Sequence, residues 1–234
     1  MRFPVILKTA PHVSESARLY YEVASNGVFQ VKETATHRAV TRVAHDIPGL
    51  HPSAEQLELR VPPLPAALLE DVLAFFREVN DRWEAEAIVI LFHRADTNEY
   101  RVGVPEQRIP CYRDWEGRWR TYLELDYGDA PRPEGFVRFG TVHSHADQAA
   151  YASAADCQDE RFQEGLHVVY GHLDRREPSR AASFVASGVR FPIDPARVLE
   201  DCEVPERRAR RDWLARVSLA PAAAASGYRS WRAR

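Results

Sequence analysis

TVHSHADQAAYASAADCQDE, the sequence from Thr141 to Glu160, combines metal-binding side chains with signals for two kinds of secondary structure. The residues just before its histidines, 136–142, are mainly apolar, aromatic and β-branched, which favours a strand. Side chains on a strand alternate between the two faces, so we expect His143 and His145 on one face and Ser144 on the other. Two imidazoles on one face can bind a single metal ion.

The second half of this stretch predicts a helix. Residues 148–160 are rich in Ala, with Gln, Asp and Glu, and contain neither Gly nor Pro. On a helix, Ser153 and Asp156 are three residues apart and would lie on the same side. Together with the two histidines, Asp156 would complete the three protein ligands of a catalytic zinc site, whose fourth position is left for water. The Ser153 hydroxyl would lie beside that open position without being a ligand.

The surrounding chain predicts a sheet and further helices. Residues 66–83 have the apolar spacing of an amphipathic helix, and three prolines in residues 61–65 precede it. The apolar run at 84–92 predicts a buried central strand, with a second strand at 98–107 antiparallel to it. Other strand patterns lie at 27–34, 36–43, 165–172 and 181–193, and 205–219 predict a helix. We therefore expect an α/β fold: a mixed, largely antiparallel sheet flanked by helices, with an N-terminal β extension.

Composition divides the chain into three parts: a β-rich extension at 1–60, a core at 61–198 and a basic tail at 199–234. From Glu206 onward there are eight arginines and two acids, a net charge of +6 in a chain whose total is −3. The tail either binds nucleic acid or an acidic partner, or is a solvated helix with a frayed end. We expect the solvated helix, because no nucleic-acid-binding motif accompanies the arginines.

Length and composition exclude several classes of protein. The 234 residues, 45% hydrophobic and 28% charged, are typical of a globular domain with extensions. A net charge of −3 predicts no general attraction to nucleic acid or to anionic membranes. No apolar run approaches the roughly 20 residues of a membrane span, and the N-terminus has no signal h-region. We expect a soluble, cytoplasmic protein with no membrane partner.

The spacing of the four polar residues resembles a known motif. His-x-His, seven residues, Ser, two residues, Asp is similar to the metal motif of the JAB/MPN (JAMM) zinc metalloprotease family, which includes bacterial deubiquitinase-like members. This chain has Ala146 where the family often has Pro, a position that is neither ligand nor acid. The sequence leading to Gln107 also resembles a Pro-x-Gln element of bacterial members. The resemblance covers about residues 64–193.

The resemblance implies a role for each motif residue. His143, His145 and Asp156 would hold Zn²⁺, and Ser153 would donate a hydrogen bond to the developing oxyanion.

The resemblance also implies a general base upstream of the motif. The family places its catalytic glutamate at the start of a strand that follows a helix, in a pattern similar to Glu-x-x-Gly-x-Leu. Glu86 matches this pattern, with Val89 in place of the glycine. The alternatives are that Glu84 is the base, or that both glutamates simply end the preceding helix at the surface. We take Glu86 as the general base.

By resemblance, the protein would be a zinc-dependent (iso)peptidase that hydrolyses the bond after the C-terminus of a ubiquitin-like protein. It would remove that protein from a conjugate or a precursor, in a bacterial ubiquitin-like conjugation or antiphage system with E1/E2-like partners. The alternative is a non-catalytic MPN interaction scaffold. A His-x-His amidohydrolase barrel is a third interpretation, but it needs about 250 residues and eight strand–helix repeats, which this chain does not show.

Some motifs have two interpretations. Cys157 is either a thiol ligand or a buried structural thiol, and its helical position about 100° from Asp156 favours the latter. His167 and His172 are either ligands or donors to the ligands. The aromatic residues of 111–128 form either a binding surface or a half-buried strand. Four further histidines have no ligand-like spacing: His12, His37, His45 and His51.

Overall fold

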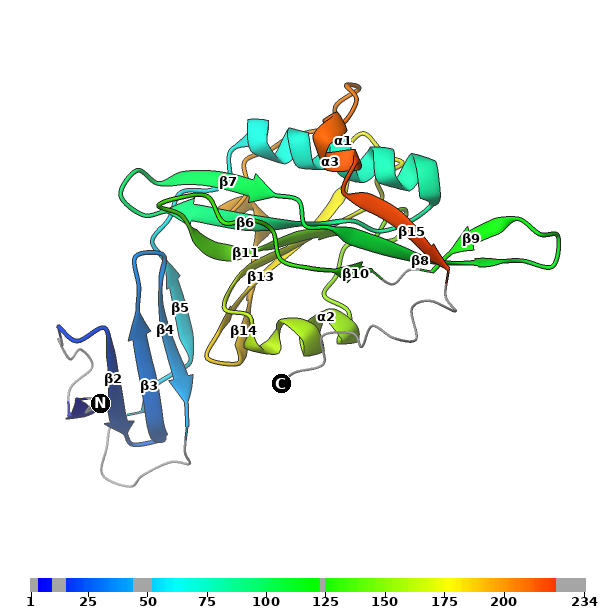
Figure 1. Cartoon of the computed structure of the whole chain (residues 1–234). Coiled ribbons are helices and arrows are strands. Elements are labelled where there is room, and N and C mark those ends of the chain that lie inside the picture. The colour runs from blue at the N-terminus through cyan, green and yellow to red at the C-terminus, as the bar shows by residue number, and fades with distance from the viewer. Residues whose placement is uncertain (1–3, 10–15, 44–51, 123–124, 222–234) are drawn as a thin grey trace. The chain divides into compact units, whose positions relative to one another are not determined.

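The computed structural model describes residues 4–9, 16–43, 52–122 and 125–221. Over these residues the chain is mostly β, with 42% strand and 17% helix, arranged in three sheets (Figure 1). The expected α/β fold, a sheet flanked by helices, is therefore wrong. None of the helices in the described ranges is both long enough and apolar enough to cross a membrane.

Two expected helices are mostly absent, and this explains much of the difference. Of residues 148–160, only α2 (Ala154–Asp159) is α-helical, because Ser153 caps its start, and a 3₁₀ turn, η1 (Glu160–Phe162), follows it. Of residues 205–219, only α3 (Arg211–Leu214) is helical. The chain then forms strand β15 (Val217–Pro221), parallel to a distant strand. Alanine and arginine favour helix locally, but capping and strand pairing override that preference.

The chain divides into two compact units, Met1–Pro62 with Ala186–Phe191, and Pro63–Val185 with Pro192–Arg234. The first contains a sheet of five consecutive strands whose alternating side chains bury one apolar cluster. The strands predicted at 27–34 and 36–43 are confirmed and pair antiparallel. The strands are β1 (Val5–Leu7), β2 (Leu19–Ala24), β3 (Gly27–Glu33), β4 (His37–Arg42) and β5 (Gln56–Leu59).

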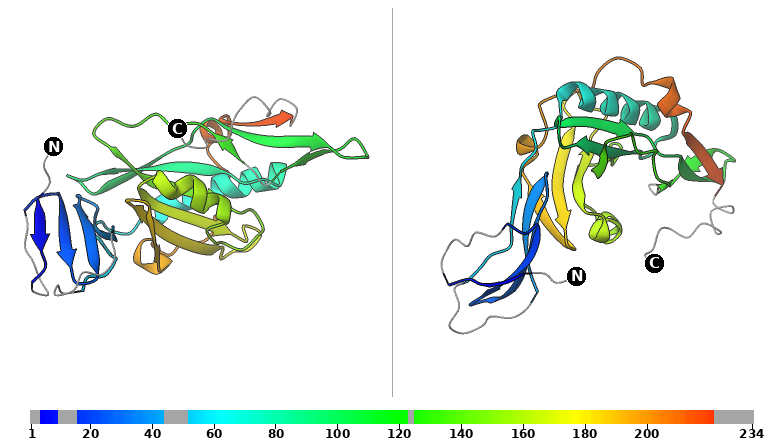
Figure 2. Two further views of the ribbon diagram at one scale, coloured as in Figure 1. Left: turned by 90° about the horizontal axis from the view of Figure 1, so that it is seen from below. Right: turned by 60° about the vertical axis from the view of Figure 1, so that its left-hand side comes forward.

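Five strands of a six-stranded sheet, whose order is β14-β13-β12-β11-β6-β7, lie wholly or almost wholly in the second unit. Helix α1 (Ala66–Trp83), as predicted, runs along this sheet and buries one apolar stripe (Figures 1 and 2). Strand β6 is buried along almost its whole length, which confirms the predicted central strand. The strands are β6 (Ile88–Arg94), β7 (Glu99–Gly103), β11 (Val137–Ser144), β12 (Gly165–Gly171), β13 (Ser179–Ala186) and β14 (Val189–Ile193).

Strands β11 and β12 approach each other more closely than side chains allow. A Cβ atom on Gly140, whose φ is +154°, would lie 1.7 Å from the carbonyl oxygen of Leu166. One on Gly165 would lie 2.2 Å from the carbonyl oxygen of Phe139. Glycine at both positions lets the two backbones meet, three residues before the first histidine of the motif.

A third sheet contains β8 (Gln107–Arg113), β9 (Trp119–Thr121), β10 (Asp126–Tyr127) and β15. Strands β8 and β9 form a hairpin that extends away from the six-stranded sheet (Figure 2). The indole of Trp115 at its tip is 90% exposed, and the rings of Tyr112 and Tyr122 contact each other. A short strand forms at 119–121, but it is mostly exposed rather than half-buried, and the binding surface stays a prediction. Residues 123–124 lie outside the described ranges.

Candidate metal centre

Two buried histidines lie at the end of the β11 strand. His143 is its penultimate residue, and His145 follows the strand directly. Their Nε2 atoms lie 3.3 Å apart, so both rings face the same point, as the alternation of side chains predicted. The backbone N–H of His145 donates to the carbonyl of Tyr170. Ala146 then turns the chain with a left-handed φ of +49°.

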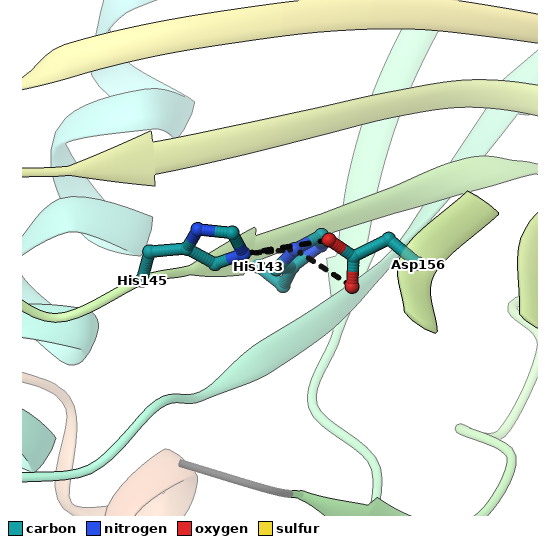
Figure 3. A group of neighbouring side chains, drawn as sticks. All are labelled: His143, His145 and Asp156. Carbon is teal, nitrogen blue, oxygen red and sulfur yellow. Dashed lines mark hydrogen bonds and ion pairs between the residues drawn. The ribbon is translucent and has the colours of Figure 1, made fainter. Parts of the chain in front are cut away.

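Asp156 on α2 completes the cluster (Figure 3). Its Oδ1 lies 3.5 Å from Nε2 of His143, and its Oδ2 lies 3.4 Å from Nε2 of His145. The three candidate ligand atoms all lie within 4.8 Å of one another, so the group could hold one metal ion. Two imidazoles and one carboxylate are a ligand set found in catalytic zinc sites.

Ser153 contacts Asp156, but as a helix cap rather than as a residue within the helix. Its Oγ accepts a hydrogen bond from the Asp156 N–H at 3.1 Å, while the Ser153 N–H donates to Asp156 Oδ2 at 2.8 Å. This capping box starts α2 at Ala154 and orients the aspartate toward the histidines. The Ser153 side chain also hydrogen-bonds the Asp156 carboxyl group and so helps to lower the pKa of that carboxyl.

The cluster is electrostatically coupled. Burial alone would raise the pKa of Asp156, but hydrogen bonds from His143 and His145 hold it well below its usual range. Burial alone would lower the pKa of His143, but its hydrogen bond to Asp156 raises it above the ordinary value. Without metal, the carboxylate and the protonated ring stabilise each other, and a cation would take the place of that proton.

Glu86 lies beside this cluster by strand register. Strand β11 is antiparallel to β6, with His143 opposite Ile88. The pairing continues beyond the strand, since the Ser144 N–H donates to the Ala87 carbonyl and the Ala87 N–H donates to the Ser144 Oγ. The same register puts Glu86 opposite His145, and opposed residues share a face of the sheet.

Burial raises the pKa of Glu86 to about 7, an effect opposed by its attraction to His145 and His143. Glu84 is placed differently. It caps the end of α1 in a left-handed conformation, and its exposed carboxylate pairs with Arg120. Of the two candidate glutamates, the structure brings Glu86 to the histidines.

Gln107 holds the backbone next to Glu86. Its side-chain oxygen accepts from the Ile88 N–H and its side-chain nitrogen donates to the Ile88 carbonyl, both at 3.0 Å. Gln107 is 1% exposed, so this amide pair is shielded from water. The Pro-x-Gln resemblance marked the residue without indicating this contact.

Other candidate residues do not join the three ligands. His172 bonds the carbonyl of Asp147, and His167 lies behind the site. Cys157 is exposed, so the expectation of a buried thiol is wrong, and it is not part of the ligand group. His37 lies in the first unit beside two threonines. His12, His45 and His51 fall outside the described ranges.

Two residues near the site were missed by sequence analysis. The ring of Tyr151 meets that of His145 edge to face at 4.9 Å and is 49% exposed. Glu160 is buried, with its Oε1 4.0 Å from Nδ1 of His143, the ring nitrogen that does not face Asp156. Its position four residues after Asp156, one helical turn away, was the available signal.

Comparison with known proteins adds no assignment. No protein-family model matches the chain, and no curated protein matches it. Among solved structures, the solution structure of protein DSY2949 from Desulfitobacterium hafniense is similar over 63% of this chain and 95% of that one. The identity is 17% and the TM-score is 0.36. Similarity at that level identifies neither a fold nor an activity.

Proposed function

We propose that this protein is a zinc-dependent hydrolase of amide bonds, with His143, His145 and Asp156 as the metal ligands and Glu86 as the general base. One observation carries the proposal: two Nε2 atoms and a carboxylate converge within 4.8 Å, and a half-buried glutamate lies across the strand pair from one of the histidines. Two imidazoles and one carboxylate are the protein ligands of many catalytic zinc sites, and a separate carboxyl group beside them can act as the base.

The side chains divide the chemistry among them. A divalent ion held by the three ligands would act as a Lewis acid and lower the pKa of water toward about 7. Glu86 accepts a proton from the attacking water and delivers it to the leaving amine. Water adds to the carbonyl carbon, the C–N bond breaks, and a carboxylate and an amine leave.

Ser153 serves the oxyanion in this proposal. Its Oγ accepts from the Asp156 N–H, and its hydroxyl proton, which also meets the Asp156 carboxyl group, turns to the oxygen that becomes negative during attack. A single donor of this kind contributes roughly 3 kcal/mol to the stability of a transition state. The capping box holds this donor beside the ligand Asp156.

The substrate proposed is the amide bond after the C-terminus of a ubiquitin-like protein, within a conjugate or a precursor. It is supported by the motif resemblance alone, through four residue types at three fixed gaps. E1/E2-like proteins of the same pathway are proposed as partners on the same basis.

The test is cleavage of a ubiquitin-like protein fused to a C-terminal extension, using the zinc-loaded full chain. Glu86→Gln should retain zinc and lose cleavage by about 10²–10⁴-fold, the usual contribution of a general base. Glu84→Gln is the matched control, because it removes an exposed carboxylate two residues away, and it should cleave normally. Zinc-loaded Glu86→Gln with wild-type cleavage would refute the assigned base. A wild type that binds no zinc would favour the non-catalytic scaffold.

A further inference from the structure

We propose that Glu160 is a positioning residue for the metal ligand His143, packed against His167, whose ring is fixed by Thr141 and Gln163. This inference rests on the proposed metal site and concerns residues that contact neither ion nor substrate. It assigns a function to a buried carboxylate that the motif does not include.

Glu160 is placed unusually for a carboxylate. It begins the 3₁₀ turn η1 directly after α2, yet it is only 6% exposed. Glutamate is rarely buried to this extent unless polar partners surround it. Its Oε1 lies 3.3 Å from Nδ1 of His167 and 4.0 Å from Nδ1 of His143.

The two nitrogens of His143 face different acids. Its Nε2 faces Asp156 at 3.5 Å, on the side of the ligand cluster, and its Nδ1 faces Glu160 at 4.0 Å. A negative charge beside Nδ1 favours the tautomer with its hydrogen there, which leaves the Nε2 lone pair for a metal. At 4.0 Å the contact is electrostatic rather than a direct hydrogen bond.

His167 is fixed beneath this carboxylate by strand register. Strands β11 and β12 are parallel, and Thr141 is paired with His167. The Thr141 Oγ1 lies 2.8 Å from Nδ1 of His167, and the Nε2 of His167 lies 2.8 Å from the Gln163 carbonyl, which can only accept. The ring is thus bound at both nitrogens and cannot rotate away from Glu160.

One short segment therefore supplies both acids. Asp156 and Glu160 are a helical turn apart, and the Glu160 N–H donates to the Asp156 carbonyl. Asp156 lies on the Nε2 side of the His143 ring and Glu160 on the Nδ1 side. A carboxylate behind a metal-binding histidine sets the orientation of its ring and increases its basicity.

The test is the affinity of the full chain for Zn²⁺, measured by competition with a chromophoric chelator. Glu160→Gln should bind zinc about 10–100-fold more weakly, the usual effect of removing such a partner. Glu164→Gln removes an exposed carboxylate from the same segment and should bind as the wild type does. The ¹⁵N shifts of the His143 ring should also report a loss of the Nδ1–H form in Glu160→Gln, a change that a merely structural role would not produce.

Wild-type zinc affinity in folded Glu160→Gln would overturn the inference. If that variant does not fold, Thr141→Val decides, because it keeps the shape of a buried strand residue and removes one bond to His167. It should weaken zinc binding, though less than the loss expected for Glu160→Gln, and unchanged affinity would overturn the inference. Zinc affinity is measured without turnover. A wild type that binds zinc but does not cleave amides would therefore refute the proposed function, while the role of Glu160 could still be tested.

Discussion

The two sides of the metal centre are held in different ways. His143 lies in β11, an interior strand of the six-stranded sheet, His145 follows that strand directly, and both are buried. Asp156 comes from α2, a six-residue helix without a buried side chain, and is held by a capping box and by the histidines themselves. The strand side is therefore fixed by the core, whereas the helix side depends on polar contacts around the ligands. We expect metal binding to stabilise the helix side more.

Breaking the strand side should have the largest effect. Gly140→Ala places a Cβ atom 1.7 Å from the Leu166 carbonyl oxygen, on a backbone that L-residues rarely adopt. The β11–β12 pair must separate, and we expect a loss of about 3 kcal/mol in the free energy of unfolding. Gly128→Ala is the control, because its Cβ meets no atom within 4 Å. Urea denaturation measures the free energy of unfolding of both variants. If Gly140→Ala were as stable as Gly128→Ala, the core would not fix β11.

Changing the helix side should weaken metal binding more than it lowers the stability of the fold. Asp156→Asn keeps a side chain that can accept the capping hydrogen bond but removes the ligand charge. Removing a residue that hydrogen-bonds a ligand usually lowers metal affinity by about 10–100-fold. Removing the charge of a ligand itself should have a larger effect, so we expect zinc affinity to fall by more than about 100-fold. The metal-free stability should fall less than in Gly140→Ala. Chelator competition and urea denaturation measure the two quantities, and a folded variant with wild-type affinity would exclude Asp156 as a ligand.

Glu86 should make the metal-free protein less stable as the pH rises. Its pKa is raised from 4.5 to about 7, so between these values the unfolded chain releases a proton that the folded chain retains. The penalty is absent below about pH 4.5 and complete above about pH 7. The shift corresponds to at most ~3 kcal/mol, reduced to about 2 kcal/mol because the side chain is only half-buried.

Replacing this carboxyl group should remove the pH effect. Glu86→Gln should therefore be more stable than the wild type at pH 8 and equal to it at pH 4. Thermal unfolding of the metal-free proteins across this range provides the measurement. A difference that does not change with pH would mean that Glu86 is not buried beside the histidines.

The smallest effect concerns the turn between the two sides. Ala146 has a φ of +49°, a conformation that costs a non-glycine residue about 1 kcal/mol. Ala146→Gly should stabilise the protein by about 0.5–1 kcal/mol, while Ala149→Gly, in the same loop without a positive φ, should not. Ala146→Pro should disrupt the site, since proline requires a φ near −65°. Stabilisation by both glycine variants would show that loop flexibility, rather than strain at Ala146, explains the gain.

Local sequence signals predicted the strand side well. Alternation brought His143 and His145 together, and the amphipathic spacing of α1 gave its bounds. The helix side was predicted less well, because the alanines before Ser153 favour helix while the Ser-x-x-Asp cap starts α2 after them.

Contacts between distant residues explain what the sequence could not predict. Strand β15 forms because it pairs with β8, more than 100 residues earlier in the chain, and this pairing contributed to the error in fold class. The spacing of Glu160 from Asp156 was a partial signal, but its contacts with His143 and His167 depend on how β11 and β12 pair.

The most direct test of the metal centre is X-ray absorption at the zinc edge of the zinc-loaded wild-type protein. We predict one four-coordinate zinc ion per chain, with two imidazole nitrogens and a carboxylate oxygen at about 2.0–2.2 Å. In Asp156→Asn, the imidazole signal should decrease compared with the wild type only in proportion to the zinc that the variant fails to bind. Sulfur scattering at about 2.3 Å, or a shell without two imidazoles, would contradict the assignment of His143, His145 and Asp156.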